Sequence, residues 1–522
     1  MSASCLCLSL CILWPAVPGD EPAVAADVVI RGATIYDGSA QPGRKGDVAI
    51  KGERIVGVGN VAVTGQPRII DGSGLIVTPG FIDLHTHSDE PIAASGTRNN
   101  KNYVVQGVTT VVTGNCGGGP VDVAAFFKKL EQNGIGSNVI HQVPHNDVRK
   151  KVMGNVNRPP TAAELVKMEE LVDKGMRDGA WSLSTGLIYN PGTYARTDEI
   201  VALAKIAAKH KGFYASHIRN EETGLLAAID EAITIGKEAG LPVHISHIKA
   251  NGQRTWGKSG EVIGVIERAR SQGQVVTADQ YPYIASSTSL AATVIPSLFR
   301  EGSPKEYKAR LADPEQRARV RKGIEQELID REGGHSLQIA QFAPEPSWQG
   351  KRLDVIAKEN GKEMIDLILD IEEKGGAATV NFGMNEEDVR HFMRQPWVAT
   401  ASDGGAKIPN SSVPHPRSYG CFARKIGYYA LAEKALPLEL ALRSCNGLPA
   451  DILHVPERGY LKPGYFADVV VFDPQTFRDT ATYDKPHQYS PGVVYLFING
   501  QLAIDKGEFK NKLAGKVLRH AE

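Results

Sequence analysis

The chain has 522 residues, of which 42% are hydrophobic, so it can bury a large core and is longer than one compact domain usually is. Lys and Arg together number 59, as do Asp and Glu, which gives a formal net charge of zero. Without a basic run, the sequence does not point to nucleic acid or to an anionic membrane surface. We therefore expect a small-molecule partner.

Residues 1–25 begin with an apolar run that is too short to span a bilayer but has the length of a signal-peptide core. Ala23, Val24 and Ala25 then offer a cleavage site with small residues. Because no Lys or Arg precedes the run, a disordered leader is the alternative. A signal peptide predicts export to the periplasm or the medium, and a plain leader predicts a cytoplasmic protein. No later run has the length of a membrane-spanning helix.

Cysteines do not form a disulfide framework in this sequence. Three of the six lie within the leader, and Cys116, Cys421 and Cys445 are scattered through the rest of the chain. For Cys421 and Cys445 we expect ordinary packing in a core.

Residues 26–76 and 454–518 share a pattern of short β-branched runs separated by turns, with no helical stretch between the first ones. We expect the two ends of the chain to pair in one β-sandwich domain. Residues 77–453 instead alternate buried-looking strands with amphipathic helical stretches. The eight strand runs are 81–85, 109–113, 138–141, 181–184, 213–217, 243–247, 275–279 and 397–401. This alternation predicts an α/β protein with a (β/α)8 TIM-like barrel.

The interval between the seventh and eighth runs is much longer than the others. Residues 285–395 contain charged helical stretches, such as those at 314–319 and 322–327. An insertion of this size at the catalytic face of a barrel predicts a lid or small subdomain over the site. A purely supporting role for the insertion is the alternative.

Potential metal ligands end four of the predicted strands. The first ends in His85-Thr86-His87, whose imidazoles point the same way on an extended chain. The second runs into Cys116, which lies among glycines that offer it no packing partners and which would bind zinc as a thiolate. The fifth and sixth end at His217 and His247. Because strand ends meet at one barrel mouth, we expect these side chains to surround a cation.

Asp403 ends the eighth strand and is followed by two glycines that let a substrate approach. A carboxylate at this place suits a general base that takes a proton from the attacking water and returns it to the leaving amine. A simple turn residue is the alternative. His244 alternates with the strand-end residues of the sixth strand, so we expect it to pack or to form hydrogen bonds away from the mouth.

In combination, these motifs resemble the N-acyl-D-amino-acid deacylases, the D-aminoacylase branch of the amidohydrolase superfamily. The resemblance covers residues 26–518, and the matching segments are 80–89, 107–117, 279–283, 402–404 and 415–420. Many superfamily members bridge two metals through a carboxylated lysine after the fourth strand, but residues 181–187 contain no lysine. In this branch a cysteine takes that place.

The resemblance implies a tight zinc ion on Cys116, His217 and His247. It also implies a second, weaker metal site at His85, His87 and Asp403, whose occupancy is not needed for turnover. By the same reasoning, Arg417 resembles the residue that holds the α-carboxylate of the substrate, with Tyr281 and Lys249 as supporting contacts. A guanidinium pairs with a carboxylate through two parallel hydrogen bonds, which suits this role. A salt bridge at the rim is the alternative for Arg417.

The function that follows is zinc-dependent hydrolysis of the amide bond of an N-acyl-D-amino acid. The alternatives are a dipeptidase that accepts a C-terminal D-residue and, outside enzymology, an inactive amidohydrolase-like scaffold. The D-preference rests on the resemblance alone. His145, which follows the third strand where relatives carry a Gly-His pair, stays unassigned, and the sequence leaves the oligomeric state open.

Overall fold

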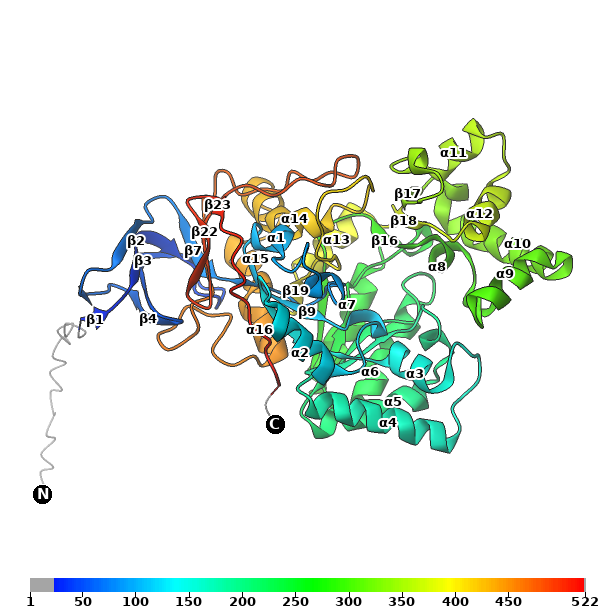
Figure 1. Ribbon diagram of the computed structural model, residues 1–522, viewed down its shortest axis with the longest axis horizontal. Coiled ribbons are helices and arrows are strands. Elements are labelled where there is room, and N and C mark those ends of the chain that lie inside the picture. The colour runs from blue at the N-terminus through cyan, green and yellow to red at the C-terminus, as the bar shows by residue number, and fades with distance from the viewer. Residues whose placement is uncertain (1–22, 521–522) are drawn as a thin grey trace, which may run out of the picture.

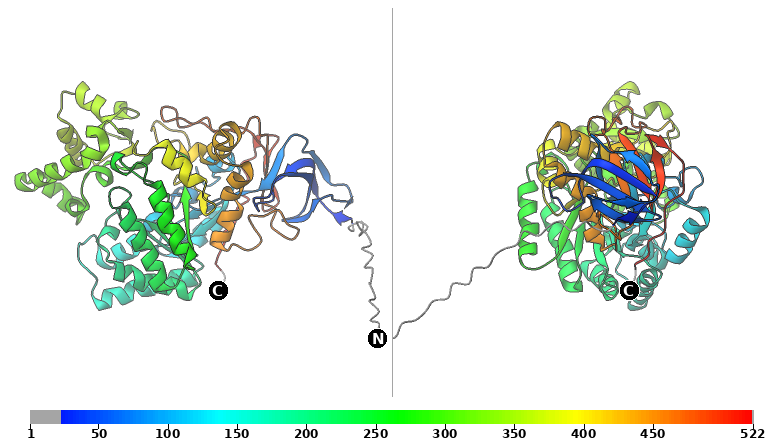
Figure 2. Two further views of the ribbon diagram at one scale, coloured as in Figure 1. Left: turned by 180° about the vertical axis from the view of Figure 1, so that it is seen from behind. Right: turned by 90° about the vertical axis from the view of Figure 1, so that its left-hand side faces the viewer.

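The computed structural model describes residues 23–520, so most of the predicted leader lies outside the described residues. The chain forms a central α/β body, a β-sheet domain at one end and a mostly helical insertion at the other (Figures 1 and 2). Within the described part of the chain, no helix combines the length and the apolar character needed to cross a membrane.

The end domain is built from both ends of the chain, as predicted. Its nine-stranded sheet has the order β23-β22-β21-β20-β7-β2-β3-β4, with β6 beside β2. The strands are β2 (Val28–Ile35), β3 (Arg44–Lys51), β4 (Arg54–Gly59), β6 (Arg68–Asp71), β7 (Ile76–Pro79), β20 (Val469–Phe472), β21 (Val493–Ile498), β22 (Gln501–Asp505) and β23 (Glu508–Phe509). The antiparallel pair β7–β20 joins the N-terminal half of the sheet to the C-terminal half. A small separate sheet pairs β1 (Val24–Ala25) with β5 (Val63–Thr64), so ordered structure begins inside the segment expected to be the leader.

The body contains the predicted ring of parallel strands. They are β8 (Phe81–Asp83), β9 (Val108–Thr113), β10 (Asn138–His141), β11 (Val143–Pro144), β12 (Ser182–Gly186), β13 (Phe213–His217), β14 (Val243–Ile245), β15 (Val276–Gln280) and β19 (Val398–Thr400). Each pairs in parallel with its neighbour, and β10 and β11 are two halves of one strand interrupted at Gln142. A parallel bridge between Thr86 and Gly404 connects the first strand to the last. The predicted (β/α)8 arrangement is therefore present.

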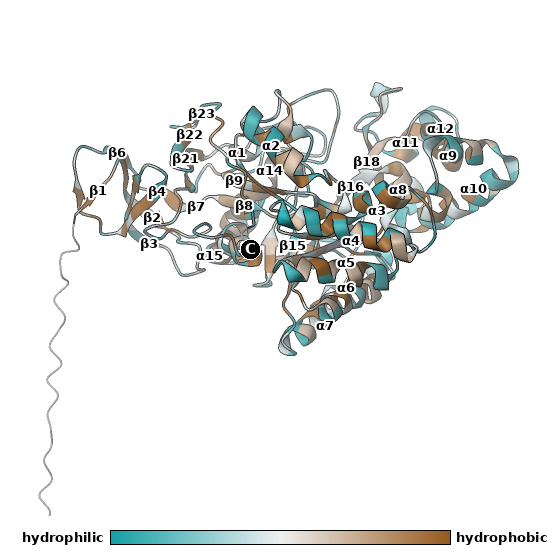
Figure 3. Cartoon of the chain, turned by 60° about the horizontal axis from the view of Figure 1, so that its bottom comes forward, coloured by the Kyte–Doolittle hydropathy of each residue, from teal (hydrophilic) through white to brown (hydrophobic). Residues whose placement is uncertain are grey.

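Helices cover the outside of this ring. They are α1 (Lys101–Val104), α2 (Val123–Asn133), α3 (His145–Met153), α4 (Ala162–Arg177), α5 (Thr197–Lys209), α6 (Leu225–Ala239), α7 (Ser259–Ser271), α13 (Glu386–Met393), α14 (Arg417–Ala423), α15 (Leu438–Cys445) and α16 (Gly447–Leu453). Helix α4 shows why they form: Thr161 and Glu164 make a capping box at its start, and Met168, Val172 and Met176 are buried against the barrel. The apolar and polar sides of the outer helices are visible as brown and teal in Figure 3.

The insertion has its own hydrophobic core, which includes Leu290, Val320, Ile339 and Leu367. It comprises β16 (Ser286–Ser289), α8 (Leu290–Val294), α9 (Pro304–Ala312), α10 (Pro314–Leu328), β17 (Leu337–Gln341), α11 (Leu353–Glu359), α12 (Met364–Glu373) and β18 (Ala378–Asn381). Its strands form an antiparallel sheet in the order β16-β18-β17. Helix α13 falls inside the predicted insertion, but it packs on α7 and β19 and its apolar side chains join the barrel core. The insertion therefore ends before residue 386.

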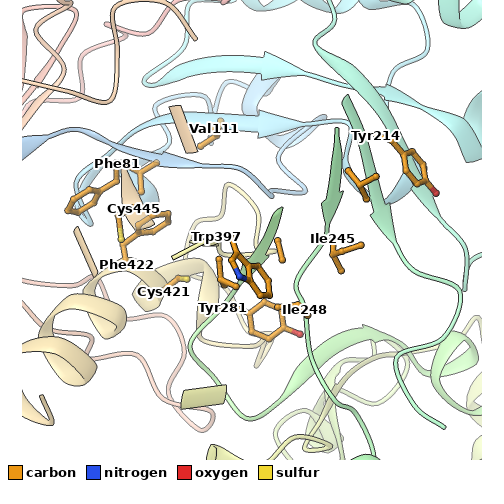
Figure 4. Close-up of a cluster of buried hydrophobic side chains, with 14 of the residues drawn as sticks. Phe81, Val111, Tyr214, Ile245, Ile248, Tyr281, Trp397, Cys421, Phe422 and Cys445 are labelled. Atoms are coloured by element: carbon orange, nitrogen blue, oxygen red, sulfur yellow. The ribbon is translucent and has the colours of Figure 1, made fainter. Parts of the chain in front are cut away.

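Cys421 and Cys445 are fully buried in the main core, where Figure 4 shows them beside Phe81 and Phe422. Phe81 and Phe422 stack with ring centroids 5.7 Å apart. Both cysteines, on the outer helices α14 and α15, therefore fill space in the main core, as predicted.

Candidate metal centre

The six predicted groups meet at one end of the barrel. His85 and His87 follow β8, Cys116 lies in the short helix η2 (Asn115–Gly117) after β9, His217 ends β13, and His247 and Asp403 follow β14 and β19. Because the strands are parallel, their carboxyl ends share one mouth. All six side chains are buried except that of His87, which is 44% exposed.

Three of these residues have left-handed backbone conformations that L-amino acids rarely adopt. The φ angles are 51° at Cys116, 36° at His247 and 49° at Asp403. Each such residue costs about 1–2 kcal/mol, so the surrounding structure must hold it in place. The sharp turn at each position ends the strand and points the side chain across the mouth.

The glycines around Cys116 leave room for this turn. A Cβ on Gly114 would lie 2.2 Å from the Gln142 carbonyl oxygen, and one on Gly117 would lie 2.2 Å from Asn146 Oδ1. An added Cβ would therefore overlap backbone at Gly114 and the Asn146 side chain at Gly117, and both glycines have positive φ angles that favour glycine. The glycines on either side of Cys116 therefore allow the chain to turn sharply enough to hold this cysteine at the mouth of the barrel.

Cys116, His217 and His247 have the geometry of a zinc site. The Cys116 Sγ lies 3.7 Å from His217 Nδ1 and 3.6 Å from His247 Nε2. In a tetrahedral site with Zn–S of about 2.3 Å and Zn–N of about 2.0 Å, sulfur and nitrogen ligands lie about 3.5 Å apart. The donor set and its spacing therefore fit zinc, and the three ligand atoms lie within 4.8 Å of one another.

The second set of predicted ligands lies beside the first. His87 Nε2 is 3.0 Å and His85 Nε2 is 3.5 Å from Asp403 Oδ1. His85 Nε2 is also 3.2 Å from the Cys116 sulfur. The structure groups His85 and His87 with Cys116, and groups Asp403 with His85 and His247, so His85, His87 and Asp403 do not form one set as predicted. Cys116 lies between the histidine pair and the cluster with His217 and His247.

Burial sets the protonation of the ligands. It raises the pKa of the Cys116 thiol well above its usual range, with the charge of Asp403 adding to the effect. It lowers the pKa of His85 to about 4 and that of His217 well below its usual range, so both imidazoles are neutral at pH 7. Burial alone would raise the pKa of Asp403, but Arg417 and the nearby imidazoles outweigh it and hold the pKa well below the ordinary value. Asp403 is therefore an anion.

Two carboxylates that the sequence analysis did not assign support the metal ligands. Asp279, at the end of β15, accepts hydrogen bonds from the His247 main-chain N at 2.7 Å and from His244 Nε2 at 2.8 Å, and lies 3.4 Å from His85 Nδ1. Glu221, in the loop after β13, lies 3.0 Å from His247 Nδ1. Asp279 could have been found from its position at the end of a predicted strand, whereas nothing in the local sequence indicates a role for Glu221.

His244 forms hydrogen bonds, as predicted, but only one of them points away from the mouth: its Nδ1 pairs with Thr277, and its Nε2 donates to Asp279 behind the metal ligands. His145 begins α3 and is buried, with its Nε2 3.0 Å from Glu199 Oε1. It belongs to a hydrogen-bonded pair behind the barrel wall and is not a member of either metal cluster.

The three predicted substrate contacts are all beside the metal cluster, but two are paired within the protein. Arg417 Nη1 lies 2.7 Å from Asp403 Oδ2, and its guanidinium carbon is 4.8 Å from the centre of the Tyr281 ring. Lys249 Nζ lies 2.5 Å from Glu221 Oε1. The Tyr281 hydroxyl is buried without a hydrogen-bond partner among the described residues. An unpaired buried hydroxyl at the mouth is a candidate ligand contact.

A cavity of about 300 Å³ opens above the cluster. Its lining includes His217, Lys249 and Asp403 from the barrel and residues such as Thr288 and Arg331 from the insertion. The insertion therefore lines part of the cavity, and its role as a lid stays a prediction.

The model of a family described as the Amidohydrolase family matches residues 68–280 and 345–504. The chain belongs to the amidohydrolase family. This amidohydrolase is 34% identical over 515 residues to a D-aminoacylase of Alcaligenes xylosoxydans xylosoxydans, in an alignment that covers 94% of the chain and 97% of the relative. An N-acyl-D-glutamate deacylase of the same organism is 32% identical, with coverage of 94% and 96%.

Comparison with solved structures supports the same family. This amidohydrolase superposes on a crystal structure of D-aminoacylase with a TM-score of 0.82 at 33% identity, covering 95% of the chain and 100% of that structure. The N-acyl-D-glutamate deacylase of Bordetella bronchiseptica, solved with zinc and a phosphonate inhibitor, gives 0.82 at 32% identity with the same coverage. The predicted family and fold class are thus confirmed.

Proposed function

We propose that this amidohydrolase uses zinc to hydrolyse the amide bond of N-acyl-D-amino acids, releasing a carboxylate and a free D-amino acid. The observation that carries the proposal is the meeting of Cys116, His217 and His247 beneath Asp403, with Arg417 beside them. Relatives that match nearly the whole chain are a D-aminoacylase and deacylases of N-acyl-D-glutamate and N-acyl-D-aspartate. They support the substrate class and its handedness.

Zinc at this site would supply a Lewis acid that polarises the acyl carbonyl and makes water a nucleophile at neutral pH. Asp403 is the residue that can move the proton, because it is a buried anion that reaches the cluster from β19. It accepts a proton from the attacking water and donates it to the nitrogen of the leaving amine.

Arg417 orients the substrate by pairing with its α-carboxylate, a geometry for which guanidinium has matching donors. Tyr281, against whose ring the guanidinium lies, offers its unpaired hydroxyl to the same group. Lys249 also lines the cavity and adds a second positive charge. As a lid, the insertion keeps bulk water from the reacting bond.

We further propose one tight zinc at Cys116, His217 and His247 and a weaker site at His85, His87 and Asp403. A D-aminoacylase has been described as having a binuclear centre with activation by one metal and attenuation by the second, which supports this division. In this chain Cys116 lies within reach of both groups, so the second ion would share the thiolate.

A dipeptidase specific for C-terminal D-residues and an inactive scaffold are not favoured. The relatives act on N-acyl-D-amino acids by name, and the six groups at the mouth are all in place. The test is to incubate the purified protein with matched acetyl-D and acetyl-L amino acids carrying acidic, apolar and aromatic side chains. We expect turnover of D-substrates only. Turnover of L-substrates alone, or of none, would contradict the proposal.

Export of the protein stays a proposal, because residues 1–22 lie outside the described residues. Cleavage after Ala25 would remove β1 from its pairing with β5. N-terminal sequencing of the protein from cell fractions tests it. A mature protein that begins near residue 26 outside the cytoplasm is expected, and an intact cytoplasmic N-terminus would contradict it.

A further inference from the structure

One carboxylate lies behind both imidazoles of the tight zinc site. Glu221 Oε1 is 3.0 Å from His247 Nδ1 and 3.8 Å from His217 Nε2. These are the ring nitrogens that do not face the Cys116 sulfur, since the other nitrogen of each ring does. A single oxygen atom therefore faces the outer edge of both ligands.

A metal-bound imidazole carries its proton on the nitrogen that does not bind the metal. The group that accepts this proton fixes the tautomer and the ring orientation and makes the imidazole a stronger ligand. His217 Nε2 is buried and has no hydrogen-bond partner among the described residues, and Glu221 Oε1 at 3.8 Å is the carboxylate oxygen that faces it. Asp279, a further carboxylate beside this site, accepts from the main chain of His247 and not from its ring. Glu221 is therefore the acceptor available to both rings.

Lys249 changes how this arrangement responds to metal. Its Nζ lies 2.5 Å from Glu221 Oε1 and 2.7 Å from His247 Nδ1. An ammonium group can only donate, so this contact needs a His247 whose Nδ1 carries no proton. A His247 that holds zinc through Nε2 presents a proton there instead. Zinc therefore favours the contact of His247 Nδ1 with Glu221 over its contact with Lys249, whose ion pair with Glu221 does not depend on the His247 tautomer.

We propose that Glu221 is the positioning residue of the zinc site, and that Lys249 balances its charge and competes with the metal-binding form of His247. The proposal rests on the proposed function only in requiring zinc at Cys116, His217 and His247. It assigns Glu221 no contact with the substrate.

The test measures zinc affinity in place of turnover. Metal-free wild type and Glu221→Gln compete for zinc with a chromophoric chelator of known affinity. We expect Glu221→Gln to bind zinc about 10- to 100-fold more weakly than the wild type. The matched control is Glu222→Gln, because Glu222 is adjacent in the same loop but pairs with Arg331 and Asn251. Its zinc affinity should equal that of the wild type. Equal affinities of Glu221→Gln and wild type would overturn the proposal.

A second variant separates the carboxylate from the packing of the loop. Lys249→Met removes the competing donor and keeps Glu221, so its zinc affinity should equal or exceed that of the wild type. A loss as large as that of Glu221→Gln would show that loop packing sets the affinity, and the proposal would be wrong. Should Glu221→Gln be insoluble, the double variant Glu221→Gln/Lys249→Met, compared with Lys249→Met, gives the same test without an unpaired lysine.

Failure of the proposed function would look different. A wild type that binds zinc at this site but leaves every N-acetyl-D-amino acid intact would contradict the deacylase proposal, whereas the affinities above would still decide the role of Glu221.

Discussion

Arg417 Nη1 lies 2.7 Å from Asp403 Oδ2, so the residue proposed to hold the substrate is paired with the residue proposed to move the proton. Both side chains are buried, and the guanidinium is one of the groups that hold the pKa of Asp403 down against the effect of burial. When the carboxylate of a substrate pairs with the Arg417 guanidinium, the guanidinium lowers the pKa of Asp403 less. Substrate binding therefore raises the pKa of Asp403 and makes it a better base.

Replacing Arg417 tests this coupling. Arg417→Gln should lower kcat/KM about 10- to 100-fold, mainly through KM, because a charge-assisted pair with the substrate is lost. Removing the positive charge also raises the pKa of Asp403, so the acidic limb of kcat/KM should move to higher pH. The measurement is a pH profile with an N-acetyl-D-amino acid. If both KM and the acidic limb of the pH profile were unchanged, Arg417 would neither bind the substrate carboxylate nor lower the pKa of Asp403.

Asp403→Asn should keep the shape of the site and lose its base. We expect kcat to fall by about 10²- to 10⁴-fold, the usual contribution of general acid–base catalysis, while zinc content stays close to that of the wild type. Turnover and metal analysis on the same preparation check this. A variant that keeps its activity would show that another group moves the proton.

Zinc binding should release a proton from Cys116. Burial raises the pKa of this thiol well above its usual range, so the metal-free protein carries the proton at neutral pH and the thiolate forms only with zinc. His217 is already neutral because burial lowers its pKa. Apparent affinity should rise about tenfold per pH unit below the thiol pKa. Calorimetry in buffers of different ionisation enthalpy counts the protons. Cys116→Ala is the control, and proton release that persists in it would contradict the assignment.

The junction between the end domain and the barrel depends on a buried ion pair between Arg458 and Asp468. The Asp468 carboxylate also accepts a hydrogen bond from Asn138 of β10 at 3.1 Å. Arg458→Met leaves the aspartate charge buried without its partner and should cost about 3–5 kcal/mol of stability. The exposed pair Arg519–Glu131 is the control, since Arg519→Met should cost at most about 1 kcal/mol. Thermal unfolding of the metal-loaded proteins compares them. Equal melting temperatures for both variants would refute the role of the buried pair.

The proximity of the strand-end residues could be predicted because the carboxyl ends of all strands in a parallel barrel lie at the same end. Once eight strands were assigned, His85, Cys116, His217, His247 and Asp403 had to share one mouth. The runs themselves were recognisable because strands buried on both faces are nearly continuous in apolar residues.

Other features depend on tertiary contacts that the local sequence does not encode. The left-handed backbone of His247 and Asp403 is unfavourable on its own, so only the assembled barrel enforces it. Glu221 lies in a loop, where no periodicity indicates the direction of a side chain. Residues 386–393 were counted with the insertion because they lie in the long interval between the seventh and eighth predicted strands, whereas the buried Val389 and Phe392 of helix α13 join the barrel core.

Anomalous diffraction at the zinc absorption edge, on crystals of the metal-loaded protein, tests the central claim most directly. The account predicts a peak bounded by Cys116 Sγ, His217 Nδ1 and His247 Nε2, at about 2.3 Å from the sulfur and about 2.0 Å from each nitrogen. A peak that lies elsewhere, or a fully loaded protein with no peak among these three atoms, would contradict it.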